Sequence, residues 1–218
     1  GPGAFVQLGE NGVDTDNTWT VDCYIYSPMA IAPGSWGTLT RGRDGDHQII
    51  VKNDGHELGG YENGRRGFVG SGWQINSLSD GWHRLTVSAG CTDPGCGTRL
   101  VIYYIDGAEV ARTDYWSETD FFAVGNYQGG QQPWRGPVYN FRLYDQMYSP
   151  LNLRPRPVQP LVAVDVDNSG EIVVYGSAAA TAAATVQGSP TIVGGPSGRL
   201  DAIQFGTGAF VQLGVNGV

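Results

Sequence analysis

Short runs of β-branched and aromatic residues alternate with tight-turn signals along most of this sequence. Asp-Gly and Asn-Gly pairs stand at residues 44–45, 63–64, 80–81 and 106–107, and such pairs supply the positive φ angles of two-residue hairpin turns. The clearest strand-like runs are 19–26, 36–40, 47–51, 82–88, 99–105, 121–124 and 138–144. Regular strand spacing of this kind predicts an all-β sandwich.

Composition favours strands over helices and provides an aromatic core. Glycine (34 residues) and proline (12 residues) are abundant, as many tight turns require, and lysine is almost absent. The 6 Trp, 11 Tyr and 7 Phe residues can bury large areas, so the core can be sizeable.

The net charge of −8 narrows the classes of partner. An acidic chain without a basic stripe argues against nucleic acid and against anionic membranes. No apolar run approaches the ~18 residues that a membrane helix needs, so we expect no membrane insertion. The charge suits divalent cations or neutral polar ligands such as glycans, and solubility alone explains it equally well.

The three cysteines give evidence on whether the protein works in an oxidising or a reducing compartment. Cys91 and Cys96 flank an Asp-Pro-Gly turn, a spacing that allows a small disulfide loop in a hairpin. Cys23 lies in an apolar run and is predicted to be a buried free thiol, and zinc would need a second cysteine pair. A disulfide between Cys91 and Cys96 favours an oxidising compartment, so we predict an extracellular or cell-surface location.

Residues 3–13 return almost unchanged as residues 208–218. The segments GAFVQLGENGV and GAFVQLGVNGV differ only at Glu10 and Val215, and the displacement is 205 residues (208 minus 3). One short strand segment is therefore duplicated rather than a whole domain. The simplest explanation is a tandem array in which 161–218 resembles the start of the next repeat, so we expect neighbouring copies of the same repeat as partners.

Composition also divides the chain into three parts. Residues 3–148 hold the dense strand pattern, 149–160 form a Pro-rich and semi-rigid linker, and 161–218 are β-rich with few aromatics. Within the last part, 161–175 reads as a hairpin that turns at 168–170. We predict one jelly roll over 3–148, with 161–218 completing a sandwich in cis or in trans.

Several motifs between about residues 17 and 148 resemble those of LamG-like domains, in the family's order. The segments concerned are WTVDCYIYSP at 19–28, DGWHRLTV at 80–87, LVIYYIDG at 100–107, AVGN at 123–126 and WRGPVYNFRLYD at 134–145. FGTGAFVQLG at 205–214 resembles the family's opening strand. The resemblance implies a concanavalin-like jelly-roll β-sandwich with an additional C-terminal β-rich segment. Tyr139 and Asn140 replace the family's acidic pair, which argues against the family's type of metal site.

In this family the first and last strands are neighbours, so the duplicated strand gives two candidates for one position. The first copy fills the position, or the second copy fills it in its own chain, or the second copy fills it in another molecule. The last arrangement would join molecules head to tail. The residues concerned are Ala4, Phe5, Val6, Ala209, Phe210 and Val211.

Candidate binding residues lie in loop-like stretches, where proteins often place functional groups. A glycan site pairs an aromatic platform with planar polar groups, and the candidates are Tyr61, Trp73, Asn126, Tyr127, Gln128, Gln131 and Trp134. Oxygen-rich turns supply candidates for a calcium site, namely Asp44, Asp46, Asp165 and Asp167. Solvated turns are the alternative for all four acids. The turn at Asp165 and Asp167 fits the start of an EF-type loop, but Gly176 stands where such a loop needs a bidentate Glu.

The motifs of common hydrolases are missing from the sequence. Glucanases of the jelly-roll class use Glu-x-Asp-x-x-Glu, whereas Glu118-Thr-Asp120 lacks the second Glu. We therefore predict a non-enzymatic repeat module of a large secreted or cell-surface protein, serving adhesion or matrix assembly, with glycan binding as a further role. The alternative is a structural subunit that polymerises head to tail by terminal strand exchange. A glucanase-like enzyme is the third hypothesis.

Overall fold

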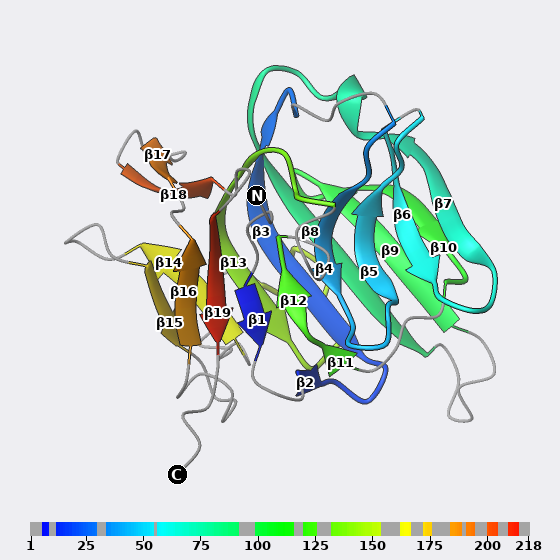
Figure 1. The fold of residues 1–218 in the computed structure, drawn as a ribbon. Helices are drawn as coiled ribbons and strands as arrows, with labels where there is room; N and C mark the ends of the chain where they lie inside the picture. The colour runs from blue at the N-terminus through cyan, green and yellow to red at the C-terminus, as the bar shows by residue number, and fades with distance from the viewer. Residues whose placement is uncertain are drawn as a thin grey trace, which may run out of the picture.

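Two β-sheets packed face to face form the body of the protein (Figure 1). This computed structural model describes residues 6–8, 12–29, 34–54, 56–91, 99–115, 120–125, 132–153, 162–166, 172–175, 184–188, 191–194, 200–204 and 209–213. Side chains are described for Leu8 and for the described residues within 12–153, and the backbone alone is described elsewhere.

The first sheet has eight strands in the order β16-β19-β1-β12-β4-β5-β6-β7. These strands are β1 (Val6–Leu8), β4 (Gly37–Arg41), β5 (His47–Val51), β6 (Glu57–Glu62), β7 (Gly67–Gln74), β12 (Ala123–Val124), β16 (Ala184–Gly188) and β19 (Ala209–Leu213). The strands from β4 to β7 pair antiparallel in chain order. This part of the sheet is therefore a meander, and the predicted turn residues Gly45 and Gly64 adopt positive φ in it.

The second sheet has nine strands, with the main path β10-β9-β8-β3-β13-β14-β15. Its strands are β3 (Trp19–Ser27), β8 (Gly81–Cys91), β9 (Arg99–Ile105), β10 (Ala108–Thr113), β13 (Pro137–Tyr144), β14 (Val162–Val166), β15 (Ile172–Tyr175), β17 (Thr191–Gly194) and β18 (Leu200–Gln204). β18 pairs with both β13 and β17. A separate two-stranded pair joins β2 (Val13–Asp14) to β11 (Asp120–Phe121), and a 3-10 turn η1 (Ile75–Ser77) follows β7.

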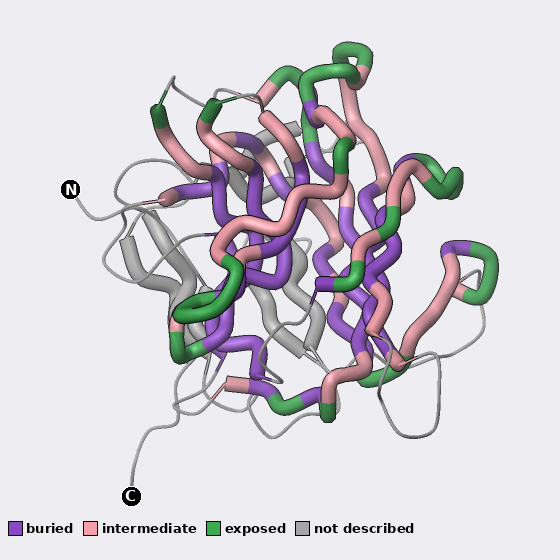
Figure 2. The backbone as a smooth tube through the Cα atoms, turned by 90° about the vertical axis from the view of Figure 1, so that its right-hand side faces the viewer, coloured by how far each residue is buried: buried purple, intermediate pink, exposed green. Residues whose placement is uncertain are grey.

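Strand alternation places the core between the two sheets. On β3, Trp19, Val21, Cys23 and Ile25 are all at most 1% exposed and belong to the core cluster, as the two-residue period of a strand requires. Cys23 is the predicted buried free thiol, and burial raises the pKa of this thiol well above its ordinary value. Figure 2 shows the same division, with buried backbone along the strands and exposed backbone at the turns.

The predicted all-β sandwich is confirmed, and two predicted runs match observed strands residue for residue. These are β5 (His47–Val51) and β9 (Arg99–Ile105). Several strands were not among the predicted runs, namely β2, β6, β7, β10 and β16. β6 and β7 follow directly after each other and carry Gly-rich sequences, ELGGYE and GFVGSGWQ, which give no clear alternation of apolar and polar residues.

Strands of the C-terminal segment pair with strands of the predicted jelly roll. The hairpin expected over 161–175 is present as β14 and β15, and β14 pairs with β13. β18 also pairs with β13, while β19 pairs with β1 in the other sheet. The segment thus contributes strands to both sheets in cis. The boundaries at 148 and 161 stay predictions.

Two further expectations concern the cysteine pair and the membrane. Cys91 ends β8 opposite Arg99 of β9. Its predicted partner, Cys96, lies outside the described residues, so the bridge stays a prediction. In the part of the chain that the structure describes, no helix has the length and apolar character to cross a membrane.

Candidate functional site

A polar pocket of about 440 Å³ opens on the first sheet, at the end of the β4–β7 meander. Its residues come from β4 and the position just before it, from β5 and β6, from the turns that follow β4 and β6, and from the segment before β13. The lining residues are Trp36, Arg41, Arg43, Asp44, Gly45, His47, Ile50, Tyr61, Asn63 and Gln132. Ile49 and Leu58 belong to the core cluster, whereas Ile50 and Tyr61, of opposite parity on the same strands, line the pocket. The pocket therefore uses the face of the sheet that points away from the core.

The turn between β4 and β5 is held against the turn after β6. The backbone N–H of Asn63 donates to Asp46 Oδ1 at 2.6 Å, and Asn63 Nδ2 donates to the carbonyl oxygen of Asp44 at 2.7 Å. A Cβ at Gly45 would lie 2.8 Å from Asn63 Nδ2, and the φ of Gly45 is +101°. Only glycine fits this close approach without strain. One wall of the pocket is therefore fixed by backbone and side-chain hydrogen bonds.

Aromatic rings form another part of the lining. Trp36 meets Tyr61 edge to face, with ring centroids 6.1 Å apart, and meets Phe68 at 5.4 Å. Tyr61 in turn meets the ring of His47 at 5.7 Å and 88°. Trp36 and Tyr61 are both half-buried. Edge-to-face contacts of this kind hold aromatic rings in defined orientations, so the wall presents rings that are already positioned.

His47 adds a neutral polar group to the site. Burial, and then the positive charge of Arg41, lower the pKa of His47 to about 3, so the ring is uncharged at neutral pH. Its Nδ1 lies 3.1 Å from Thr38 Oγ1, and the Thr38 hydroxyl donates to Gln132 Oε1 at 3.2 Å. A hydroxyl that donates to Gln132 offers His47 only its lone pairs. The Nδ1–H tautomer of His47 matches this arrangement, because that N–H can donate to the Thr38 oxygen.

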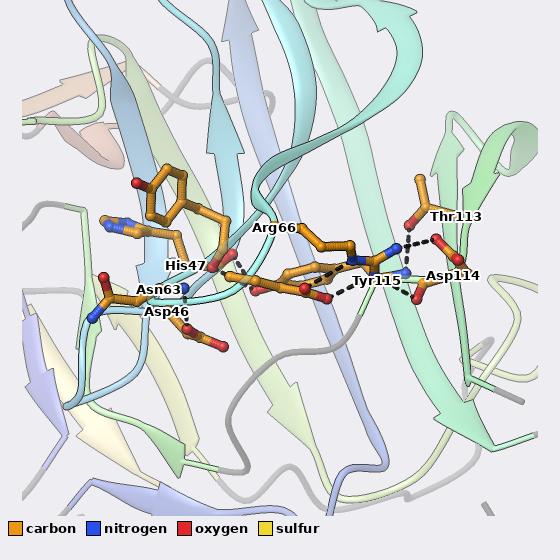
Figure 3. A network of polar contacts seen from close by, with 9 residues as sticks. Asp46, His47, Asn63, Arg66, Thr113, Asp114 and Tyr115 are labelled. Atoms are coloured by element: carbon orange, nitrogen blue, oxygen red, sulfur yellow. Dashed lines mark hydrogen bonds and ion pairs between the residues drawn. The ribbon is translucent and has the colours of Figure 1, made fainter. Parts of the chain in front are cut away.

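Tyr115 fastens the two strands beneath the pocket, as Figure 3 shows. Its hydroxyl donates to the carbonyl oxygens of His47, at 2.6 Å, and Tyr61, at 3.2 Å. Tyr115 is 1% exposed, and burial raises the pKa of its hydroxyl well above the ordinary value. The hydroxyl therefore stays protonated and keeps donating. Because it bridges β5 and β6, it sets the spacing of two pocket residues.

An ion-pair cluster closes the same end of the meander. Arg66 binds the carboxylate of Glu62 through two hydrogen bonds, at 2.8 and 2.7 Å, and Asp114 Oδ1 at 3.0 Å. The side chain of Glu62 is 3% exposed, so its charge is compensated by a bidentate partner. The cluster links the turn after β6 to the segment that carries Tyr115 (Figure 3).

Substituting Gly60 should displace the Tyr115 ring that holds β5 and β6 together. A Cβ at Gly60 would lie 2.5–2.7 Å from ring atoms of the buried Tyr115. We expect Gly60→Ala to lower the free energy of unfolding by about 3 kcal/mol, the upper part of the usual range for overpacking, as measured by urea denaturation. Gly136→Ala is the matched control, because Gly136 is buried and its Cβ would meet only an ordinary contact at 3.4 Å. Equal losses in the two variants would contradict the role given to Tyr115.

The structure separates the predicted glycan-binding residues. Tyr61 lines the pocket. Trp73 is half-buried on β7 and packs against the core cluster. Trp134 is 0% exposed and belongs to the core, so its ring faces the interior rather than a ligand surface. The other four candidates, Asn126, Tyr127, Gln128 and Gln131, lie outside the described residues.

Of the four predicted calcium ligands, the structure places two beside the pocket. Asp44 is exposed and lines it, and Asp46 is 4% exposed and accepts the Asn63 N–H. Asp165 lies on β14, described by its backbone alone, and Asp167 lies outside the described residues. Among the described residues, no group of three or more His, Cys, Asp or Glu side chains is placed to hold a metal ion. Calcium binding at the predicted aspartates stays a prediction.

Comparison with known proteins identifies the fold. No family model and no curated protein matches the chain. A solved structure from Bacteroides ovatus ATCC 8483, a “putative carbohydrate binding protein”, is similar over 97% of this chain and 59% of that chain, with 15% identity and a TM-score of 0.52. The chain has a concanavalin-like jelly-roll fold.

A second solved structure with detectable similarity comprises domains LG4-5 of the mouse laminin alpha1 chain. It matches 68% of this chain and 42% of that chain, with 16% identity and a TM-score of 0.43. The chain spans less than two thirds of the length of either protein. The expected concanavalin-like jelly roll is confirmed as a fold by the two packed sheets and by the similarity to the Bacteroides ovatus structure.

Sequence reasoning missed most of the pocket of this jelly roll. Trp36, Arg43, Asn63 and Gln132 come from four separate segments. Their proximity depends on the hydrogen bonds between turns and on a bridge between Thr38 and Pro133. In the sequence, the pair Asn63-Gly64 predicted only a turn. It did not predict that Asn63 would form hydrogen bonds with Asp44 and Asp46.

Proposed function

We propose that this chain is a non-enzymatic, glycan-binding module of a secreted or cell-surface protein, and that the pocket on β4–β6 is its sugar site. The observation that carries the proposal is the meeting of the Trp36 and Tyr61 rings with Asn63, Gln132 and Asp44 around one pocket of about 440 Å³. Small-molecule sites commonly have volumes of ~300–1,000 Å³, with aromatic walls and a few polar groups that fix orientation.

The chemistry of the pocket suits a sugar. A pyranose ring presents C–H groups on its faces, which pack on aromatic rings, and hydroxyls at its edge, which need both donors and acceptors. Asn63 and Gln132 carry amides, and the uncharged ring of His47 adds a further polar group to the lining. The side chains of Asp44 and Arg43 are exposed at the rim and can take a hydroxyl or a charged substituent.

A binding role fits the pocket better than catalysis. Most glycoside hydrolases place two carboxylates on either side of the bond they cleave. Among the described lining residues, Asp44 is the one acid. The name of the Bacteroides ovatus protein also refers to carbohydrate binding. We place the module in adhesion or matrix assembly, the setting in which an acidic, soluble glycan-binding module of a surface protein would act.

Glycan-array screening followed by titration calorimetry tests the proposal. We expect the wild-type chain to bind at least one oligosaccharide on the array, and Tyr61→Ala to weaken that binding at least roughly tenfold, as loss of a central aromatic contact does. Tyr26→Ala is the matched control, because Tyr26 is 37% exposed on the second sheet, away from the pocket. Absence of any glycan binding, or an equal loss in both variants, would overturn the assignment.

A further inference from the structure

The two copies of the duplicated segment lie side by side in the first sheet. β19 pairs with β1 in parallel, with Val211 beside Val6, Gln212 beside Gln7 and Leu213 beside Leu8. Each residue of β1 therefore lies next to its own copy, because the register equals the 205-residue displacement of the repeat (208 minus 3). The described strands are identical at all three paired positions. Two equivalent strands are thus present where a jelly roll needs one.

The position of β1 is defined by contacts that either copy can make. β1 pairs antiparallel with β12, with Val6 opposite Val124 and Gln7 opposite Ala123. The backbone N–H of Leu8 donates to the carbonyl oxygen of Phe122 at 2.6 Å, and Leu8 is 0% exposed within the core cluster. Residues 208–214 repeat residues 3–9 without change. A second-copy strand in this position would supply the same backbone groups and the same leucine.

The sheet order shows which edge of β19 would pair with β12 if β19 took the position of β1. β1 binds β12 through one edge and β19 through the other. Because β1 and β19 are parallel and in register, the edge of β19 that corresponds to the β12-binding edge of β1 is the edge that β1 now covers. β19 can therefore pair with its own β1 or with a β12, and not with both.

We propose that β19 is an exchangeable strand, which leaves its own β1 and replaces β1 in a second copy of this chain. It would pair antiparallel with β12 of that copy, in the register that β1 has here. Main-chain hydrogen bonds supply the affinity of such strand addition, and side-chain pockets supply its specificity. A donor strand and a distant acceptor position form a heterologous contact, so repeated exchange builds open chains of molecules.

Whether a donated β19 replaces β1 depends on how stably β1 is held in its own chain. Both strands carry the same residues, so replacement of one by the other changes few contacts, and the cost is mainly that of association. The intact chain therefore keeps β19 in cis at low concentration. Weakening β1 favours a donated strand, and it does so without involving the sugar pocket.

Mixing two variants of the full chain tests the proposal. The acceptor is Leu8→Ala/Leu213→Ala, labelled with a fluorophore, because neither of its own copies then carries the leucine. The donors are the wild-type chain and, as matched control, Leu213→Ala. We expect sedimentation velocity to show a complex of one acceptor and one donor that forms at least roughly tenfold more tightly with the wild-type donor, since Leu→Ala at a buried position has a large cost.

A peptide provides a second readout that does not depend on the donor's own fold. A synthetic peptide with the sequence of residues 207–214 should raise the thermal midpoint of the acceptor variant, and the same peptide with Ala in place of its leucine should not. An acceptor that forms no complex with the wild-type donor and gains no stability from the peptide would overturn the proposal. Equal binding by the two donors would overturn it as well. Neither result bears on glycan binding, which is measured separately.

Discussion

Acidification from pH 7 to pH 4.5 should destabilise the wild-type chain by about 3 kcal/mol more than it destabilises His47→Asn. The folded chain holds the pKa of His47 at about 3, below its ordinary value of 6.5, because burial and then the charge of Arg41 disfavour the imidazolium. Between these values the unfolded chain binds a proton that the folded chain does not, so stability falls as the pH falls from about 6.5 towards 3. Each pKa unit corresponds to about 1.4 kcal/mol.

Urea denaturation at several pH values measures this difference. Asn keeps a polar group at the position of Nδ1, next to Thr38, and has no proton to gain, so the variant loses some stability at pH 7 but little more on acidification. Carboxylates titrate in the same range in both proteins and cancel in the comparison. A wild-type curve parallel to that of His47→Asn would mean that His47 is protonated in the folded chain.

His83 gives a control of opposite sign. Partial burial lowers its pKa, but the Asp106 carboxylate at 2.7 Å and the Ser79 carbonyl outweigh this, and the net shift is upward. A raised pKa in the folded state contributes stability below the ordinary pKa, and this contribution is lost as the pH rises through the folded value. His83→Asn should therefore steepen the loss of stability in acid, whereas His47→Asn should reduce it.

The sequence predicted the parts of the fold that depend on local pattern. β5 and β9 have dense β-branched and aromatic residues, HQIIV and RLVIYYI, and their bounds were predicted without error. β6 and β7 were missed because glycines interrupt their pattern. Two of these glycines have a tertiary cause. A Cβ at Gly59 would lie 2.4 Å from the Val69 carbonyl oxygen, and one at Gly60 would meet Tyr115. No local rule shows which distant group requires a glycine.

The dependence on distant contacts also explains why most pocket residues were not predicted. Tyr61 was predicted from its aromatic character in a polar stretch, and it does line the pocket. Trp134 had the same character in sequence and is fully buried, since an aromatic residue in a Gly-rich stretch can face either side of the chain. His47, Asn63 and Gln132 reach the pocket through pairing between segments up to 94 residues apart, as the Thr38–Gln132 bond illustrates. The local sequence around each of these residues does not indicate which distant segment it will contact.

Trp19→Ala should be among the most destabilising single substitutions in the chain. Trp19 is 1% exposed, at the start of β3, and its ring lies 5.0 Å from that of Phe121 in an edge-to-face contact at 79°. Phe121 belongs to β11 and pairs with Val13 of β2, so the indole ring attaches this small strand pair to the second sheet. Removal of a buried Trp side chain costs about 3–5 kcal/mol, which for a chain of this size lowers the thermal midpoint by about 10–15 °C.

Trp82→Ala provides the matched control for Trp19→Ala. Trp82 lies on β8, which pairs with β3 along its whole length, but its half-buried ring faces away from the core and contacts Tyr26 at 5.5 Å. The same atoms are deleted from the same pair of strands, but on the other face of the sheet and near the other end of the pair. We expect Trp82→Ala to lower the midpoint by less than half as much, because a partly exposed ring buries less apolar area. Similar midpoints for the two variants in calorimetry would mean that the core does not lie on the Trp19 side of β3, and the face assigned to every residue of that strand would have to be reversed.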